Sequence, residues 1–258
     1  MKIANKIVVI TGASSGIGAL MAEKFAAAGA VPILMARSVS KLQKVASEIQ
    51  GNHDVFPLDV TDARQVAETM QQVVERYGRI DILINNAGYG VFETFEKASL
   101  DQFEDMMNVN YMGTVRCTKA ALPFMLKAGS GYIVNVASMA GKIGSAKSSG
   151  YSATKHAVLG FTNSLRQELV GTGVGLTAIN PGPIDTPFFD RADPSGAYVK
   201  NVSWFMLKPE KVVTDIIDAI ERNIPEKNLP RVASLGVKLF QLFPRAFDKI
   251  AYRLLNKK

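Results

Sequence analysis

Short apolar runs and longer amphipathic segments alternate along this chain, and this alternation restricts the fold more than any other feature. The short runs are rich in β-branched and aliphatic residues, which favour strands. They cover residues 7–10, 31–36, 55–58, 80–84, 132–136 and 176–179. Strands that are apolar on both faces predict a parallel sheet buried between two layers of helices. We therefore expect an α/β fold with a doubly wound sheet.

The segments between these runs have the apolar spacing of helices, and most of them end at glycine. They cover residues 14–28, 41–49, 63–77, 100–127, 152–170 and 209–222. No linker rich in proline or serine divides the chain, so we interpret residues 1–230 as one domain. Residues 231–258 differ in composition and are interpreted as a separate C-terminal segment.

Charge is concentrated in that C-terminal segment. The 258 residues carry a formal net charge of +7, and seven bases and one acid within 231–258 account for +6 of it. This distribution disfavours nucleic-acid binding by the domain. Two histidines and one cysteine are too few for a conventional zinc site, so we expect no metal. The single cysteine also excludes an intramolecular disulfide and, with no apolar run of about 18 residues, favours a cytoplasmic location.

A glycine-rich turn follows the first expected strand and leads into the first expected helix. Gly12, Gly16 and Gly18 would let the backbone approach a pyrophosphate, and a helix N-terminus supplies free N–H groups to it. The alternative is a tight turn that binds no ligand. The strand–turn–helix context favours a dinucleotide site.

Four motifs, in this order, resemble those of the short-chain dehydrogenase/reductase family. They are T-G-x-x-x-G-x-G at 11–18, N-N-A-G at 85–88, Y-x-x-x-K at 151–155 and P-G at 181–182. Together they span about residues 5–190, and their combination is far more specific than any one of them. The resemblance implies a Rossmann fold and hydride transfer between a nicotinamide cofactor and a ketone, aldehyde or alcohol.

The resemblance also assigns the chemistry. Tyr151 is expected to be the acid/base, and Lys155 to assist it and bind the ribose of the cofactor. Residues four apart share one face of a helix. A neighbouring ammonium favours a phenolate, so we expect Lys155 to lower the pKa of Tyr151 from its ordinary value of about 10.

Two further residues complete the expected catalytic set. Ser138, thirteen residues before Tyr151, would hold the substrate oxygen, and Asn110 would hold a water in a proton relay. Asn108 is a competitor for Asn110. The serines that compete with Ser138 are Ser145, Ser148, Ser149 and Ser152.

The end of the second expected strand bears on the choice of cofactor. A carboxylate there would bind the adenosine ribose and repel a 2′-phosphate. This chain has Met-Ala-Arg-Ser at 35–38, and Arg37 can pair with a 2′-phosphate. We therefore predict NADP(H) over NAD(H), with a merely solvated Arg37 as the alternative.

The cofactor site predicted from these motifs extends along the ends of the strands. By resemblance, Asp59 would contact the adenine amino group and Thr186 the nicotinamide carboxamide. The full expected set is Gly12, Ser14, Ser15, Gly16, Ile17, Gly18, Arg37, Ser38, Asp59, Val60, Asn86, Ala87, Gly88, Tyr151, Lys155, Pro181, Gly182 and Thr186.

The substrate is expected to lie under residues 186–208. This stretch and the one after the N-N-A-G motif are rich in aromatic and aliphatic side chains, which predict a small apolar carbonyl or alcohol substrate. They are Phe188, Phe189, Tyr198, Trp204, Phe205, Met206, Tyr89, Val91 and Phe92. Ordinary packing or a subunit interface is the alternative, and the sequence does not choose among apolar carbonyl compounds.

The C-terminal segment has apolar residues at helical spacing with bases between them, and Pro244 is expected to break or kink the helix. The apolar set is Val232, Leu235, Leu239, Leu242, Phe243, Ala246, Ile250 and Leu254. It could pack on the domain or on another subunit of a dimer or tetramer. It could also contact an anionic membrane peripherally. A non-catalytic NADP(H)-binding protein or a membrane-peripheral protein is the alternative to an enzyme.

Overall fold

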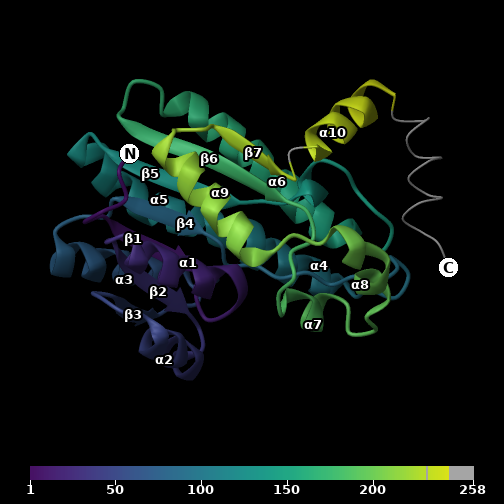
Figure 1. Ribbon diagram of the computed structural model, residues 1–258, viewed down its shortest axis with the longest axis horizontal. Coiled ribbons are helices and arrows are strands. Elements are labelled where there is room, and N and C mark those ends of the chain that lie inside the picture. Colours follow the sequence, from purple (N-terminus) through teal and green to yellow (C-terminus); the bar gives the residue numbers. More distant parts are fainter. Residues whose placement is uncertain (231, 244–258) are drawn as a thin grey trace.

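The computed structural model describes residues 1–230 and 232–243. Seven strands form one sheet in the order β3-β2-β1-β4-β5-β6-β7, and every neighbouring pair is parallel (Figure 1). The strands are β1 Ile7–Thr11, β2 Val31–Ala36, β3 Asp54–Pro57, β4 Ile82–Asn85, β5 Gly131–Val136, β6 Val174–Pro181 and β7 Glu226–Leu229. The doubly wound α/β fold expected from the sequence is confirmed.

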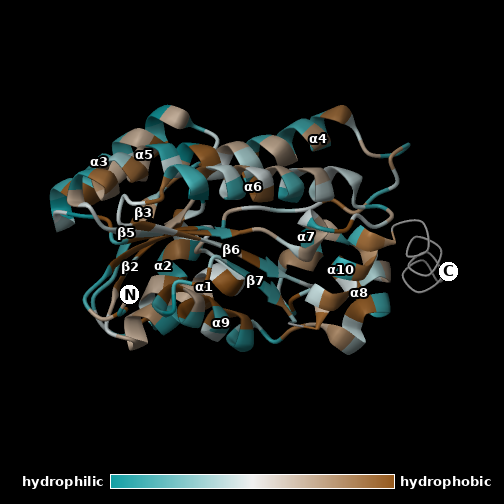
Figure 2. Cartoon of the chain, turned by 90° about the horizontal axis from the view of Figure 1, so that it is seen from above, coloured by the Kyte–Doolittle hydropathy of each residue, from teal (hydrophilic) through white to brown (hydrophobic). Residues whose placement is uncertain are grey.

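Helices cover both faces of the sheet (Figure 2). Those on one face are α1, α2 and α9, and those on the other are α3, α5 and α6. Within β1, Val8 and Ile10 pack into the first layer while Ile7 and Val9 pack into the second, because strand side chains alternate. The helices are α1 Gly16–Ala27, α2 Val39–Glu48, α3 Ala63–Tyr77, α4 Leu100–Met106, α5 Gly113–Ala128, α6 Ser149–Glu168, α7 Phe188–Ala192, α8 Ala197–Val202, α9 Pro209–Glu221 and α10 Ala233–Leu242.

The expected helix over 100–127 is interrupted in its middle. A π-helical turn, η1 Met107–Met112, separates α4 from α5. Such turns are rare and frequently lie at functional sites because they change which side chains face inward. Here the turn contains Asn110, which is 1% exposed. The sequence gives no signal for this interruption.

The structure contains a seventh strand, β7, which the sequence analysis does not predict. Its residues are Glu-Lys-Asn-Leu, which lack the apolar character of the other strands. Lys227 is buried, and its Nζ lies 2.8 Å from carboxylate oxygens of both Asp215 and Asp218 in α9. Because α9 neutralises this charge, a polar segment can close the edge of the sheet.

The chain continues beyond β7 into α10, which ends two residues before Pro244. This end agrees with the break expected at that proline. Residues 231 and 244–258, which hold the remainder of the expected basic amphipathic segment, lie outside the described residues. Within the described chain, no helix has both the length and the apolar character needed to span a membrane.

Candidate active site

The sheet order reverses between β1 and β4, where doubly wound sheets bind ligands at the carboxyl ends of their strands. The glycine turn lies at this point. Gly12 and Gly16 have φ values of 66° and 55°, in the left-handed region that favours glycine. A Cβ on Gly18 would lie 2.2 Å from the carbonyl oxygen of Gly12, and one on Gly12 would lie 2.9 Å from the Cα of Ala87. The turn therefore packs backbone against backbone.

The N-N-A-G motif holds this turn in place. The hydroxyl of Thr11 accepts the N–H groups of Asn86 and Ala87, each at 3.0 Å. The side-chain amide of Asn86 donates to the carbonyl oxygens of Thr11 at 3.0 Å and Gly12 at 3.2 Å. Helix α1 then begins at Gly16 without an acidic residue in its first turn. The free N–H groups at the N-terminus of this helix suit an anionic pyrophosphate. Ser14 and Ser15 immediately precede the helix, and Ile17 lies in its first turn.

Arg37 directly follows β2, and its side chain is 66% exposed. Its Nη1 lies 4.0 Å from Oδ2 of Asp59, whose Oδ1 accepts the N–H of Thr61 at 2.9 Å and its hydroxyl at 2.7 Å. An exposed ion pair of this length contributes little energy, so the guanidinium can turn to a phosphate. Ser38 lies next to it and accepts the N–H of Lys41 at the start of α2. These donors fit a dinucleotide that carries a phosphate on its adenosine ribose.

Four further residues of the expected cofactor set lie at different places in the fold. The Cβ of Thr186 is 3.6 Å from the position that a Cβ on Gly16 would take. Pro181 ends β6, and the N–H of Gly182 donates to the carbonyl oxygen of Leu229 at 2.7 Å, which anchors the P-G motif to β7. Val60 lies away from the turn, under the start of α5, where a Cβ on Gly113 would meet it at 2.8 Å.

The Y-x-x-x-K and N-N-A-G motifs meet at Lys155 of α6. This lysine is 6% exposed, and its Nζ donates to the carbonyl oxygen of Val136 at the end of β5, at 2.8 Å. A Cβ on Gly88 would lie 3.0 Å from Oδ1 of Asn110 and 3.8 Å from Nζ of Lys155. The structure therefore brings the side chains of Asn110 and Lys155 together beside Gly88 of the N-N-A-G motif.

Asn110 is held by three hydrogen bonds. Its Oδ1 accepts the N–H of Tyr89 at 2.9 Å, and its Nδ2 donates to the carbonyl oxygen of Tyr89 at 2.8 Å and to the hydroxyl of Thr154 at 3.0 Å. Asn108, the competing residue, instead accepts a hydrogen bond from Arg116 through its Oδ1, at 2.8 Å. Asn110 therefore ties the π-helical turn to α6 and to the loop after β4.

Ser138 lies just beyond β5 and is 9% exposed. Its hydroxyl donates to the carbonyl oxygen of Pro181 at 3.3 Å and accepts the N–H of Ala140 at 3.1 Å. Among the competing serines, Ser148 is 2.9 Å from Ser145 and 3.0 Å from Ser152 through their hydroxyl oxygens. These three satisfy one another, whereas Ser138 is the serine that interacts with Tyr151.

The ionisation of Tyr151 and Lys155 is governed by burial. Burial raises the pKa of Tyr151 to about 12, and its hydrogen bond with Ser138 acts in the opposite direction. Burial lowers the pKa of Lys155 to about 8. The sequence predicts a lowered pKa for Tyr151, and this prediction is wrong. The reason is that Lys155 directs its ammonium to Val136, 5.7 Å from the centre of the tyrosine ring, so desolvation outweighs its attraction.

Aromatic rings from three segments surround Tyr151. The ring of Phe92, after β4, lies 5.8 Å from that of Tyr151, and Phe188 of α7 lies 5.7 Å from it on centroids. Tyr198 of α8 packs edge-on against Phe92 at 4.8 Å and stacks on Phe189 at 5.6 Å. These contacts place four aromatic residues of the expected substrate region in one group next to the phenol of Tyr151.

Not all of residues 186–208, which the sequence predicts to cover the substrate, lie near Tyr151. This stretch contains α7, α8 and a short 3₁₀ turn, η3 Ser203–Phe205. Trp204 is 83% exposed and packs edge-on against Phe205 at 4.7 Å. Trp204 therefore lies on the surface and does not line the space beside Tyr151.

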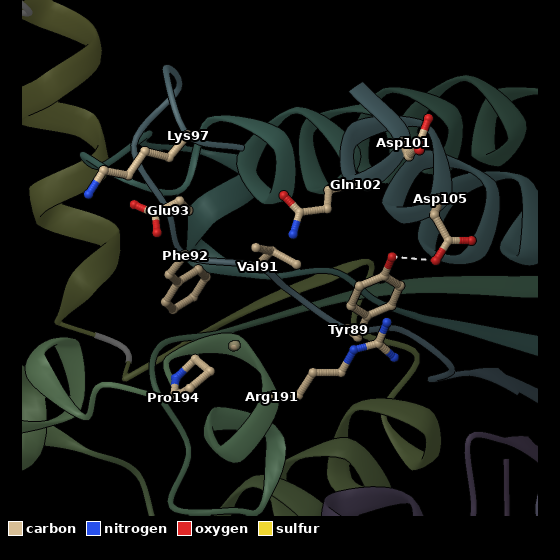
Figure 3. A pocket seen from close by; sticks show the side chains of 11 residues that line it. Tyr89, Val91, Phe92, Glu93, Lys97, Asp101, Gln102, Asp105, Arg191 and Pro194 are labelled. Carbon is tan, nitrogen blue, oxygen red and sulfur yellow. Dashed lines mark hydrogen bonds between the residues drawn. The ribbon is translucent and has the colours of Figure 1, made fainter. Parts of the chain in front are cut away.

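A cavity of about 630 Å³ lies next to this aromatic group, between the loop after β4, α4 and α7 (Figure 3). Phe92 lines it, but Tyr151 does not. The guanidinium of Arg191 stacks 3.5 Å from the ring centre of Tyr89, whose hydroxyl donates to Asp105 at 2.6 Å. Sequence reasoning missed Arg191 and Asp105, because no motif links residues that meet only in the folded chain.

Comparison with known sequences agrees with this architecture. The sequence profile of the short chain dehydrogenase family matches residues 6–195. An uncharacterised oxidoreductase of Staphylococcus saprophyticus is 40% identical over 197 residues, which cover 75% of this chain and 84% of that protein. An uncharacterised oxidoreductase of Staphylococcus epidermidis is 36% identical over 192 residues, with 74% and 84% covered.

Solved structures give the same result. A short chain dehydrogenase/reductase from Burkholderia phymatum in complex with NAD superposes with a TM-score of 0.88 at 25% identity, covering 95% of this chain and 96% of that one. An alcohol dehydrogenase from Thermococcus sibiricus complexed with 5-hydroxy-NADP gives 0.76 at 30% identity, with 87% and 94% covered. With its fold, its glycine turn and the Tyr151–Lys155 pair in the expected places, this chain belongs to the short-chain dehydrogenase/reductase family.

Proposed function

We propose that this protein is an NADP(H)-dependent oxidoreductase that interconverts an apolar ketone or aldehyde and the corresponding alcohol. The observation that carries the proposal is the position of Tyr151, with Ser138 and a group of aromatic rings around it. A phenol in that position can reach a substrate oxygen that the rings shield from water. The presence of Asn110 and Lys155 beside it favours an enzyme over a protein that only binds the cofactor.

The nicotinamide cofactor supplies or accepts the hydride. During reduction, the hydroxyl of Tyr151 donates its proton to the substrate oxygen as the carbon receives the hydride, and during oxidation the phenolate accepts that proton. Ser138 donates a hydrogen bond to the same oxygen and stabilises the charge that develops on it. The Lys155 ammonium lies where it can offset the negative charge left on Tyr151 after proton donation.

Arg37 supports NADP(H) as the cofactor. The two structural neighbours described above carry NAD in one case and an NADP derivative in the other, so the fold accommodates both. In this chain an exposed guanidinium follows β2, in the position where a carboxylate would repel a 2′-phosphate. A planar guanidinium binds a phosphate through two parallel hydrogen bonds.

The reaction test uses purified protein, NADPH and a panel of apolar ketones and aldehydes. We expect oxidation of NADPH to match the alcohol formed, with Tyr151→Phe as the inactive control. Binding of NADPH without turnover of any carbonyl compound, or of any alcohol with NADP⁺, would contradict the proposal. That result would favour the non-catalytic alternative.

A further inference from the structure

Helix α10 presents an apolar stripe to the outside of the molecule. It contacts the body through Val237, which is 4% exposed, and through Ser234, whose hydroxyl accepts a hydrogen bond from Asn228 of β7 at 3.0 Å. Five large apolar side chains of residues 232–243 are instead 46–72% exposed. They are Val232, Leu235, Leu239, Leu242 and Phe243, which we call the α10 stripe. Figure 1 shows α10 beyond the end of β7, at the edge of the molecule.

The stripe is continuous along the helix. At 100° per residue, its five members fall within an arc of about 100°, and Val237 lies on the opposite side. A helix on a protein surface normally turns its apolar side inward. This helix turns Val237 inward, whereas its three leucines are turned outward. Contiguous exposed apolar side chains of this kind mark an interaction surface.

Charge identifies what covers the stripe. Residues 232–243 contain one base, Lys238, and no acid, and the sequence from 231 to 258 carries +6 in total. Lys238 lies about 40° beyond the edge of the stripe on the same helix. Pairing two copies of this chain through α10 would bring two strongly basic segments together, which electrostatic repulsion opposes. An apolar stripe with Lys238 near its edge, in a segment whose sequence is strongly basic, matches a surface that is apolar below and anionic above.

We propose that the α10 stripe docks this protein on an anionic lipid bilayer. The leucines and Phe243 enter the boundary between the headgroups and the acyl chains, and Lys238 contacts a lipid phosphate. The docking does not depend on the proposed reaction. The two would serve the same end, because apolar substrates partition into membranes, close to where the aromatic site would be held.

The experiment is flotation of the full chain with vesicles. We expect recovery with vesicles of phosphatidylcholine and phosphatidylglycerol, little recovery with phosphatidylcholine alone, and loss of binding in concentrated salt. The double variant Leu235→Gln/Leu239→Gln should lower the bound fraction at least about tenfold. The matched control is Leu100→Gln/Val170→Gln, which changes two apolar side chains that are each 77% exposed elsewhere. It should float like the wild type.

Three results would overturn the proposal. One is flotation of the α10 double variant equal to that of the wild type, and another is equal recovery with neutral and anionic vesicles. The third is a wild-type dimer in light scattering that the α10 double variant converts to a monomer, which would show that a second copy covers the stripe. Thermal melting by circular dichroism checks that both variants are folded. These readouts need neither cofactor nor turnover, so they are independent of the proposed reaction.

Discussion

The cofactor side and the substrate side of the candidate site are built from different parts of the chain. On the cofactor side, backbone packs on backbone, as between Gly12, Gly18 and Ala87. On the substrate side, side-chain rings from separate segments meet around Tyr151, and Phe92 and Phe188 contact it directly. The cofactor side therefore has no space for an added atom at Gly12 or Gly18, whereas the substrate side can exchange one ring for another. Close backbone packing suits a site that always binds the same cofactor, and exchangeable rings suit a site whose substrate can differ between related proteins.

The largest expected effect is that of Tyr151→Phe, which removes one oxygen and leaves the ring contacts in place. General acid catalysis contributes about 10²–10⁴-fold, so kcat should fall by that factor. Binding of NADPH should weaken by less than about tenfold, because only one of the expected cofactor contacts is removed. Steady-state kinetics with a carbonyl substrate test this, and turnover near the wild-type rate would show that another group supplies the proton.

The next effect concerns Lys155, where the two sides meet. Burial lowers its pKa from 10.5 to about 8, so the folded state holds this proton less tightly than the unfolded state. Between these values the unfolded state binds more protons at this group, so Lys155 by itself should make stability rise with pH by about 3 kcal/mol. Lys155→Met should lack this rise. Denaturant unfolding at several pH values between 7 and about 10.5 gives the comparison, and parallel curves for both proteins would contradict the burial effect.

A pair of glycine substitutions tests how tightly the cofactor side is packed. Gly18→Ala places a Cβ 2.2 Å from the carbonyl oxygen of Gly12, and should cost about 2 kcal/mol or more of stability. Gly160→Ala is the control, because no atom lies within 4 Å of its added Cβ on the exposed side of α6. It should stabilise the protein by about 0.5–1 kcal/mol. Equal effects in denaturant unfolding would show that the glycine turn is not tightly packed.

The smallest expected effect is that of Tyr198→Phe on the substrate side. The ring contacts with Phe92 and Phe189 remain, and only a hydroxyl is lost. One hydrogen bond to substrate contributes about 1 kcal/mol, so kcat/KM should fall by less than about tenfold. A loss as large as that in Tyr151→Phe would make Tyr198 the better candidate for the proton donor.

The sequence predicts those parts of the molecule whose signals are local. Apolar strands and the glycine turn are contiguous, so the sheet and the cofactor side follow from them. Strand β7 could not be predicted, because Lys227 depends on carboxylates of α9. The π-helical turn around Asn110 has no compositional signature, although the family resemblance assigns a role to the residue itself. The stacking of Arg191 on Tyr89 joins residues about a hundred positions apart, which no local pattern encodes.

The direction of the Tyr151 pKa shift also could not be predicted from the sequence. Spacing places Lys155 one turn from Tyr151, and this predicts a lowered tyrosine pKa. Burial and the hydrogen bond to Val136 are properties of the folded chain, and they reverse the direction.

The central claim is that the cofactor side selects a phosphorylated dinucleotide through Arg37. Isothermal titration of NADPH and NADH into the wild type and Arg37→Gln tests it most directly. We expect NADPH to bind at least about tenfold more tightly than NADH, and Arg37→Gln to remove that preference while leaving the NADH affinity unchanged. Equal affinities in the wild type, or equal weakening of both cofactors by the substitution, would contradict the claim.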